Sequence, residues 1–101
     1  MNIRNFEQSR IFDGDEVKIT DVLDKTVIIK DFRVFQSKYY DNDYMVVQIE
    51  NNGKLQTFST SSEVLKKQLE DEKNKGLPIR ALITKEERYY CLKPPVKKTI
   101  D

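Results

Sequence analysis

Aromatic and basic side chains gather in one short stretch of the chain, Arg33-Val-Phe-Gln-Ser-Lys-Tyr-Tyr-Asp-Asn-Asp-Tyr44. A second, smaller group follows near the C-terminus, where Arg88 precedes Tyr89 and Tyr90. Flat rings stack on the bases of single-stranded nucleic acids, and lysine or arginine side chains neutralise their phosphates. Residues of these types indicate a contact surface rather than a reaction centre.

The sequence contains few of the residue types that usually perform catalysis or bind metal ions. The chain has no histidine, which removes the commonest general base and the commonest metal ligand. A catalytic thiolate needs a basic partner, so the single cysteine, Cys91, is interpreted as a small strand residue. The three glycines, Gly14, Gly53 and Gly76, are too far apart to form a phosphate-binding loop. We expect no enzyme activity, no metal site and no cofactor.

The length of 101 residues suits one domain, and the hydrophobic content of 38% suits a modest core. The net charge of +1 hides an uneven distribution. Residues 1–26 carry four basic and six acidic side chains, whereas residues 77–101 carry six basic and three acidic ones. No apolar run approaches the length of a membrane span, and the N-terminus lacks a signal-peptide core. We expect a cytoplasmic protein without membrane contact.

The first long strand is predicted to bend. Residues 26–36, TVIIKDFRVFQ, are rich in β-branched and aromatic residues, but their apolar residues occupy both alternating phases. That pattern fits a strand whose two halves serve different faces of a sheet. The remaining predicted elements are strands at 44–50 and 54–59 joined by Asn51-Asn-Gly53, a helix from Thr60 (its N-cap, with Glu63) to about Lys75, and strands at 79–84 and 89–93.

This order of elements looks like that of the OB-fold, a five-stranded, partly open barrel, here with one helix between strands 3 and 4. The competing architecture is an open antiparallel sheet with the helix across one face. The domain is predicted to span residues 17–93, between a flexible arm (1–16) and a disordered basic tail (94–101). Both architectures bury the same residues: Val27, Ile29, Val34, Met45, Val47, Ile49, Leu55, Leu65, Leu69, Ile79, Ala81, Ile83 and Leu92.

OB-folds bind oligonucleotides on the face of strands 2 and 3, between the loops that follow strands 1 and 4. On this chain that face also shows Gln48 and Gln56, while Asp41 and Asp43 oppose phosphate binding. Other aromatic residues are interpreted as core, namely Phe32, Phe35, Phe58 and one of Tyr89 and Tyr90, which point to opposite faces of a strand. The predicted contact residues are Lys30, Arg33, Lys38, Tyr39, Tyr40, Tyr44, Arg88, Tyr89 and Tyr90.

The stretch from residue 24 to residue 93 contains the segments KDF, SKY, TFSTSSEVL and RYY. In these it resembles small proteins encoded by bacteriophages and conjugative elements of Gram-positive bacteria. The resemblance implies an OB-like fold and single-stranded DNA binding during replication or recombination.

The leading hypothesis is therefore a non-catalytic, single-stranded DNA-binding protein of a phage or mobile element. The alternative is a protein-interaction module that uses the same exposed aromatic residues. Its partner would be a replication protein, or a second copy of the chain that pairs at a strand edge to form a homo-oligomer.

Overall fold

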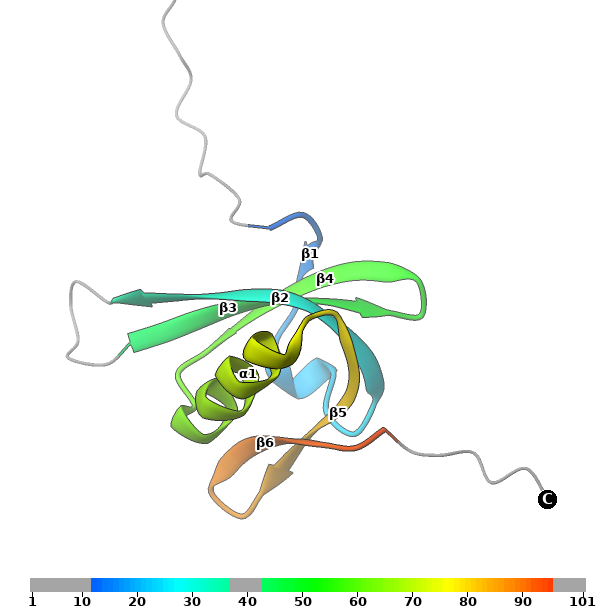
Figure 1. Ribbon diagram of the computed structural model, residues 1–101. Helices are drawn as coiled ribbons and strands as arrows, with labels where there is room; N and C mark the ends of the chain where they lie inside the picture. The colour runs from blue at the N-terminus through cyan, green and yellow to red at the C-terminus, as the bar shows by residue number, and fades with distance from the viewer. Residues whose placement is uncertain (1–11, 37–42, 96–101) are drawn as a thin grey trace, which may run out of the picture.

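The computed structural model describes residues 12–36 and 43–95 of the chain. They form one six-stranded sheet in the order β1-β4-β3-β2-β5-β6, with one α-helix packed on it (Figure 1). In chain order the elements are β1 (Asp15–Glu16), the 3₁₀ turn η1 (Ile19–Asp21), β2 (Thr26–Gln36), β3 (Asp43–Asn51), β4 (Lys54–Thr60), α1 (Glu63–Lys75), β5 (Ile79–Glu86) and β6 (Tyr89–Lys93). All strand pairs are antiparallel except β1 with β4.

The predicted bend in the first long strand is confirmed, and a β-bulge at Lys30 causes it. Ile29 pairs with Ile49 and Asp31 pairs with Gln48, so Lys30 has no opposite residue on β3. Before the bulge Val27 and Ile29 are buried, and after it the buried residue is Phe32. The extra residue therefore exchanges the two faces of β2. The N-terminal end of the strand pairs with β5, and the remainder pairs with β3.

The turn between β3 and β4 follows the predicted Asn-Asn-Gly segment. Asn51 pairs with Lys54, and the two residues between them have φ angles of 51° for Asn52 and 80° for Gly53. Tight hairpin turns require positive φ at both central positions, which asparagine and glycine tolerate best. The two strands are thereby held in a single register.

The helix begins later than the sequence predicted. Thr60 was expected to be the N-cap, but it still belongs to β4 and pairs with Met45. The N-cap is Ser62, whose hydroxyl oxygen accepts a hydrogen bond from the backbone N–H of Leu65 at 3.3 Å. Leu65 and Leu69 then turn into the core, and Gly76 ends the helix as predicted.

The predicted five-stranded barrel is wrong, because the described strands form an open sheet of six. Side chains of the α1 segment occupy the edge of β6 where a closing strand would pair. The Gln68 amide donates to the Leu92 carbonyl and accepts from the Leu92 N–H, and the Ser62 hydroxyl donates to the Tyr90 carbonyl. With these edge groups satisfied, β4 and β6 remain unpaired. Since β1 precedes the predicted strands, α1 follows the fourth strand rather than the third.

The core lies between α1 and the inner face of the sheet. Its buried hydrophobic residues are Val22, Val27, Ile29, Phe32, Met45, Val47, Ile49, Phe58, Leu65, Leu69, Ala81 and Ile83. Phe32 and Phe58 were predicted correctly, but Val34 and Leu55 were not, since they are 39% and 38% exposed. Val34 lies beyond Ile29, where β5 stops pairing with β2, and Leu55 lies beside the β3–β4 turn. No helix in the described part of the chain is long and apolar enough to span a membrane.

Candidate nucleic-acid interface

Part of the outer face of the sheet carries exposed aromatic residues. Directly opposite residues of antiparallel strands share a face. Arg33 pairs with Val46, Val46 with Ser59, and Phe35 with Tyr44, so all five lie on the side opposite the buried Met45 and Val47. We call these five residues the aromatic half. The rings of Phe35 and Tyr44 stack with their centroids 5.5 Å apart and an interplanar angle of 25°.

The bulge at Lys30 determines which side chains reach this face. Because it shifts the alternation of β2, Phe32 turns into the core while Arg33 and Phe35 turn outward. The prediction that Phe35 is a core residue is therefore wrong, as the side chain is only half-buried and contacts Tyr44. The signal was present in the sequence, since Phe35 follows the polar Arg33 by two residues and so shares its face.

The charges near the aromatic half favour an anionic ligand. Arg33 and Arg88 are exposed and form no salt bridge with another described residue. Asp43 was expected to oppose phosphate binding, but Lys66 Nζ lies 3.3 Å from its carboxylate. The hydrogen bond to Asp43 raises the pKa of the Lys66 ammonium group, so the lysine keeps its positive charge beside this carboxylate.

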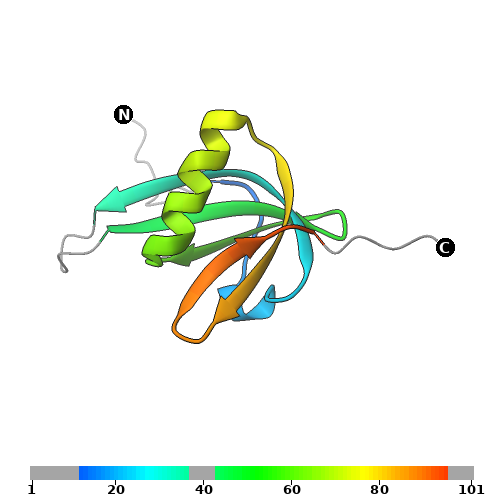
Figure 2. The ribbon, with the colours of Figure 1, turned by 60° about the horizontal axis from the view of Figure 1, so that its bottom comes forward.

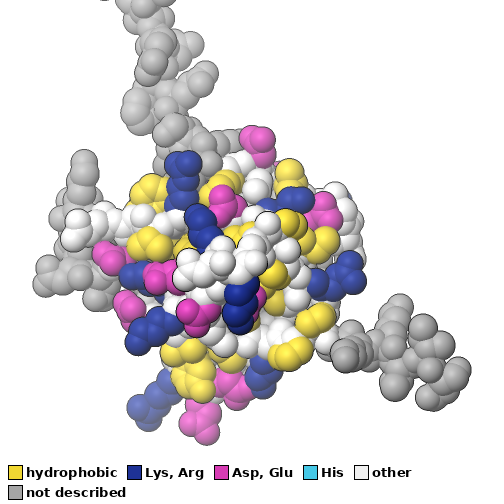
Figure 3. Space-filling model, viewed as in Figure 1, with side chains coloured by type: hydrophobic (Ala, Val, Ile, Leu, Met, Phe, Trp, Pro, Cys, Tyr) yellow, Lys and Arg dark blue, Asp and Glu magenta, His cyan; other side chains and the backbone are white. Residues whose placement is uncertain are grey.

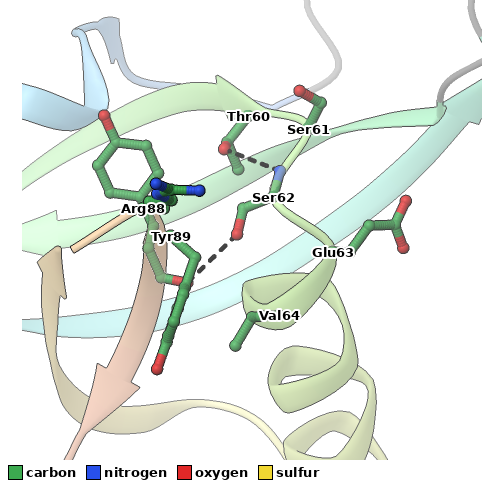
Figure 4. A pocket seen from close by; sticks show the side chains of 8 residues that line it. Thr60, Ser61, Ser62, Glu63, Val64, Arg88 and Tyr89 are labelled. Atoms are coloured by element: carbon green, nitrogen blue, oxygen red, sulfur yellow. Dashed lines mark hydrogen bonds between the residues drawn. The ribbon is translucent and has the colours of Figure 1, made fainter. Parts of the chain in front are cut away.

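A pocket of about 340 Å³ lies between the first turn of α1 and the β5–β6 turn. The residues that line it are Thr60, Ser61, Ser62, Glu63, Val64, Arg88, Tyr89 and Tyr90. In Figure 4, Arg88 and Tyr89 face the serine and threonine side chains, while the Glu63 carboxylate points away from them. The lining of the pocket therefore combines hydroxyl groups, a guanidinium group and aromatic rings.

The two adjacent tyrosines of β6 differ in exposure, as predicted. Tyr89 is 45% exposed, whereas Tyr90 is half-buried and packs against the core. Lys85 Nζ lies 5.9 Å from the centroid of the Tyr90 ring, a cation–π contact between paired residues of β5 and β6. Tyr89 is thus the tyrosine of this pair that can offer a ring to a ligand.

The aromatic half and the pocket lie at the same end of the molecule. Thr60, which lines the pocket, pairs with Met45, the residue after Tyr44. Directly opposite residues share a face, so Thr60 and the pocket lie on the α1 side of the sheet, at the same end as the stacked rings but on the opposite face. Figures 1 and 2 show the open end of the β2–β3 hairpin, the first turn of α1 and the β5–β6 turn on the same side.

A comparison with protein-family models matches residues 13–93 to a domain of unknown function, DUF8468. The chain belongs to this family. The matched DUF8468 region begins just before β1 and ends with the last residue of β6, so it contains every strand of the sheet and α1. Comparisons with curated proteins and with solved structures gave no match.

The DUF8468 fold does not bring all the predicted contact residues together. Arg33, Tyr44, Arg88 and Tyr89 lie at the end just described. Lys30 lies at the bulge, five residues from Phe35, which corresponds to roughly 16 Å along a strand. Lys38, Tyr39 and Tyr40 fall outside the described residues. Among pocket residues, the sequence interpretation missed Thr60, Ser61, Ser62, Glu63 and Val64, because it assigned this segment to the cap and first turn of the helix.

Gln48 and Gln56 were expected on one open binding face, but the N-terminal segment of the DUF8468 domain lies against Gln48, and Gln56 pairs with the buried Ile49 and so lies on the opposite face. The Gln48 side chain donates to the Asp13 carbonyl at 2.9 Å, and Gln56 pairs with Asp15 of β1. On the side of the molecule that carries α1, acidic and basic side chains alternate without a continuous basic area (Figure 3). Within residues 12–36 and 43–95, no cluster of acidic or cysteine side chains is arranged to hold a metal ion.

Proposed function

We propose that this protein is a non-catalytic single-stranded DNA-binding protein, and that the DNA contacts the aromatic half and the adjacent pocket. The observation that carries the proposal is the stacked pair of the half-buried Phe35 and the exposed Tyr44 on a sheet face beside Arg33, a cation without a described partner. A stack of two rings presents a further flat surface to a base, and the arginine side chain can neutralise a neighbouring phosphate.

The pocket supplies a second contact for the same strand of DNA. Tyr89 offers a further ring and Arg88 a further guanidinium group at the same end of the molecule, in the pocket on the α1 side of the sheet. Base–aromatic stacking contributes about 1–3 kcal/mol per base and tolerates any sequence. Binding that depends on ring faces rather than on base edges is therefore expected to show little sequence preference.

The arrangement of the five long strands also supports the proposal. The bent β2 is the central strand, with β3 and β4 on one side and β5 and β6 on the other. This order is compatible with an OB-like fold that is open between β4 and β6. The resemblance of residues 24–93 to proteins of phages and conjugative elements supports a role in replication or recombination of such an element.

The proposal is tested by titrating fluorescently labelled oligo-dT with the full chain and measuring anisotropy. Tyr44→Ala is compared with Leu55→Ala, because both side chains are 38% exposed, and their residues lie near opposite ends of the same sheet face. Tyr44→Ala is expected to weaken binding by about 1–3 kcal/mol. Leu55→Ala is expected to leave affinity unchanged.

Salt dependence gives a second readout of the same titration. With roughly three phosphate contacts, log K should fall against log salt with a slope near −2, as expected of single strands. No anisotropy change at low salt with micromolar protein would contradict the proposal. Equal losses of affinity in the two variants would contradict the assignment of the site.

A protein partner is the second candidate function. An exposed aliphatic side chain in the pocket favours it, since Val64 is 37% exposed beside Tyr89. Exposed aliphatic groups next to aromatic ones are typical of protein interfaces. Its test is co-precipitation of a purified replication protein, or self-association in the ultracentrifuge, after nuclease treatment. A complex that resists nuclease and is lost in Tyr44→Ala would favour this candidate over DNA binding.

A further inference from the structure

The N-terminal segment Asp13–Glu16, here called the acidic strap, runs along the edge of the sheet beside β4 (Figure 1). Asp15 pairs with Gln56 and Glu16 with Thr57, and the next residue, Val17, donates its N–H to the Thr57 carbonyl at 2.8 Å. The pairing is parallel and only two residues long, so backbone contacts alone do not extend far. Other contacts must hold the strap where it is.

Two such contacts hold the strap against the outer face of β3 and β4. A Cβ atom on Gly14 would lie 2.8 Å from the carbonyl carbon of Leu55, so the glycine backbone lies directly against β4. The Gln48 side chain, which points outward, donates to the Asp13 carbonyl at 2.9 Å. Thr57, opposite Gln48 on the same face, is only 6% exposed. The strap therefore covers the face around Gln48 and Thr57, on the side toward the β3–β4 turn.

The strap differs in charge from the aromatic half. It carries three carboxylates, Asp13, Asp15 and Glu16, and all three side chains are exposed. The aromatic half carries Arg33 and no acidic residue. A phosphate that follows the outer face away from Tyr44 would approach these carboxylates, and like charges near a protein surface repel one another. The covered half is thus both sterically and electrostatically closed to a polyanion.

We propose that the acidic strap ends the DNA track, so that one protein molecule contacts only a short length of single strand over the aromatic half and the pocket. This inference rests on the proposed function and adds the footprint to it. The site size of one OB fold that binds single strands ranges over about 4–16 nucleotides. The strap places this protein at the short end of that range.

The experiment measures affinity for oligo-dT of about 4, 8, 12 and 16 nucleotides, a series that covers the usual site sizes. The full chain is compared with D15N/E16Q and with the matched variant E70Q/D71N. Glu70 and Asp71 are adjacent, exposed carboxylates on α1, so both variants change the net charge equally. All four side chains are exposed, and thermal melting confirms that the variants fold.

The wild-type affinity is expected to stop rising beyond the shorter oligonucleotides. D15N/E16Q should bind the longest oligonucleotide at least about fivefold more tightly than E70Q/D71N, the size of one relieved charge repulsion, and should match it on the shortest one. Equal affinities of the two variants at every length would overturn the role of the strap while leaving DNA binding intact. Absence of binding by the wild type and both variants would overturn the proposed function and this inference together.

Discussion

The two halves of one sheet face differ sharply, although the same strands build both. Toward the open end of the β2–β3 hairpin, the outward positions of β2 and β3 hold the stacked rings of Phe35 and Tyr44. Toward the β3–β4 turn, the outward positions hold Gln48 and Thr57, and the acidic strap lies across them. No other described segment lies across the stacked rings, whereas the acidic strap lies across Gln48 and Thr57 in the other half.

A small domain would be expected to cover its apolar surface first, but here the N-terminal segment covers polar residues. Polar outward residues need no cover, whereas exposed rings leave apolar surface in water. A chain that folds its N-terminal segment over Gln48 and Thr57 leaves the stacked rings exposed at the other end. Exposed apolar groups that gather at one place are typical of binding surfaces. The aromatic half is for this reason the part of the face to which we assign binding.

The largest expected effect is a loss of stability when the contact between the acidic strap and β4 is disturbed. Gly14→Ala should lower the free energy of unfolding by about 2–4 kcal/mol, because the added Cβ meets the Leu55 backbone and the residue has positive φ. Gly53→Ala is the control, since its φ is also positive but nothing lies within 4 Å of the added atom. It should lower the stability by only about 1 kcal/mol. Denaturant unfolding measures both, and equal losses would show that the strap does not lie tightly on β4.

The second largest expected effect is a loss of DNA affinity when a ring of the aromatic half is removed. Phe35→Ala should weaken oligo-dT binding by about 1–3 kcal/mol, because it removes one of the two stacked rings. Tyr44→Phe keeps a ring of the same shape and should bind as the wild type does. A loss of affinity in Tyr44→Phe as large as that in Phe35→Ala would indicate that the hydroxyl group, rather than the ring face, makes the contact.

A smaller effect is expected from the arginine of the aromatic half. Arg33→Gln should lower the magnitude of the salt slope by about 0.7, the value for one phosphate contact on a single strand. Arg80→Gln removes an exposed arginine that pairs across the sheet with Ile28, away from the aromatic half. Its slope should stay at the wild-type value. Identical slopes for the two variants would mean that Arg33 acts only through net charge.

The smallest effect tests the covered half again. Gln48→Ala removes the hydrogen bond to the Asp13 carbonyl and should lower the stability by about 0.5–1.5 kcal/mol. Affinity for short oligo-dT should not change, because the side chain lies outside the aromatic half. A clear loss of affinity for short oligo-dT would place Gln48 in the binding surface, as the sequence alone suggested.

Local signals in the sequence predicted much of this fold. The two phases of apolar residues in 26–36 predicted a bent strand, and the bulge at Lys30 explains it. The Asn-Asn-Gly turn and the helix end at Gly76 depend on backbone preferences of single residues, which sequence reports well. The alternation of Met45, Val47 and Ile49 identified the buried face of β3.

Features that depend on distant contacts were missed. Nothing local predicts that Gln68 will satisfy the edge of β6 and leave the sheet open. The pairing of Asp15 and Glu16 with β4 uses backbone groups of two polar residues, which lack the pattern of a strand. The face of Phe35 was also missed, because the sequence interpretation did not locate the bulge at Lys30 and did not use the spacing of Phe35 from Arg33. These are the features that place the candidate site.

The most direct test of DNA binding by the aromatic half is an ¹H–¹⁵N NMR titration of the full chain with oligo-dT. We predict that amide shifts concentrate at residues 33–35, 44–46, 59–61 and 88–90, which surround the stacked rings and the pocket. Residues 13–17, 48–50 and 54–57 should stay nearly unchanged. Shifts that concentrate on the covered half, or the absence of any shift at low salt, would contradict the account.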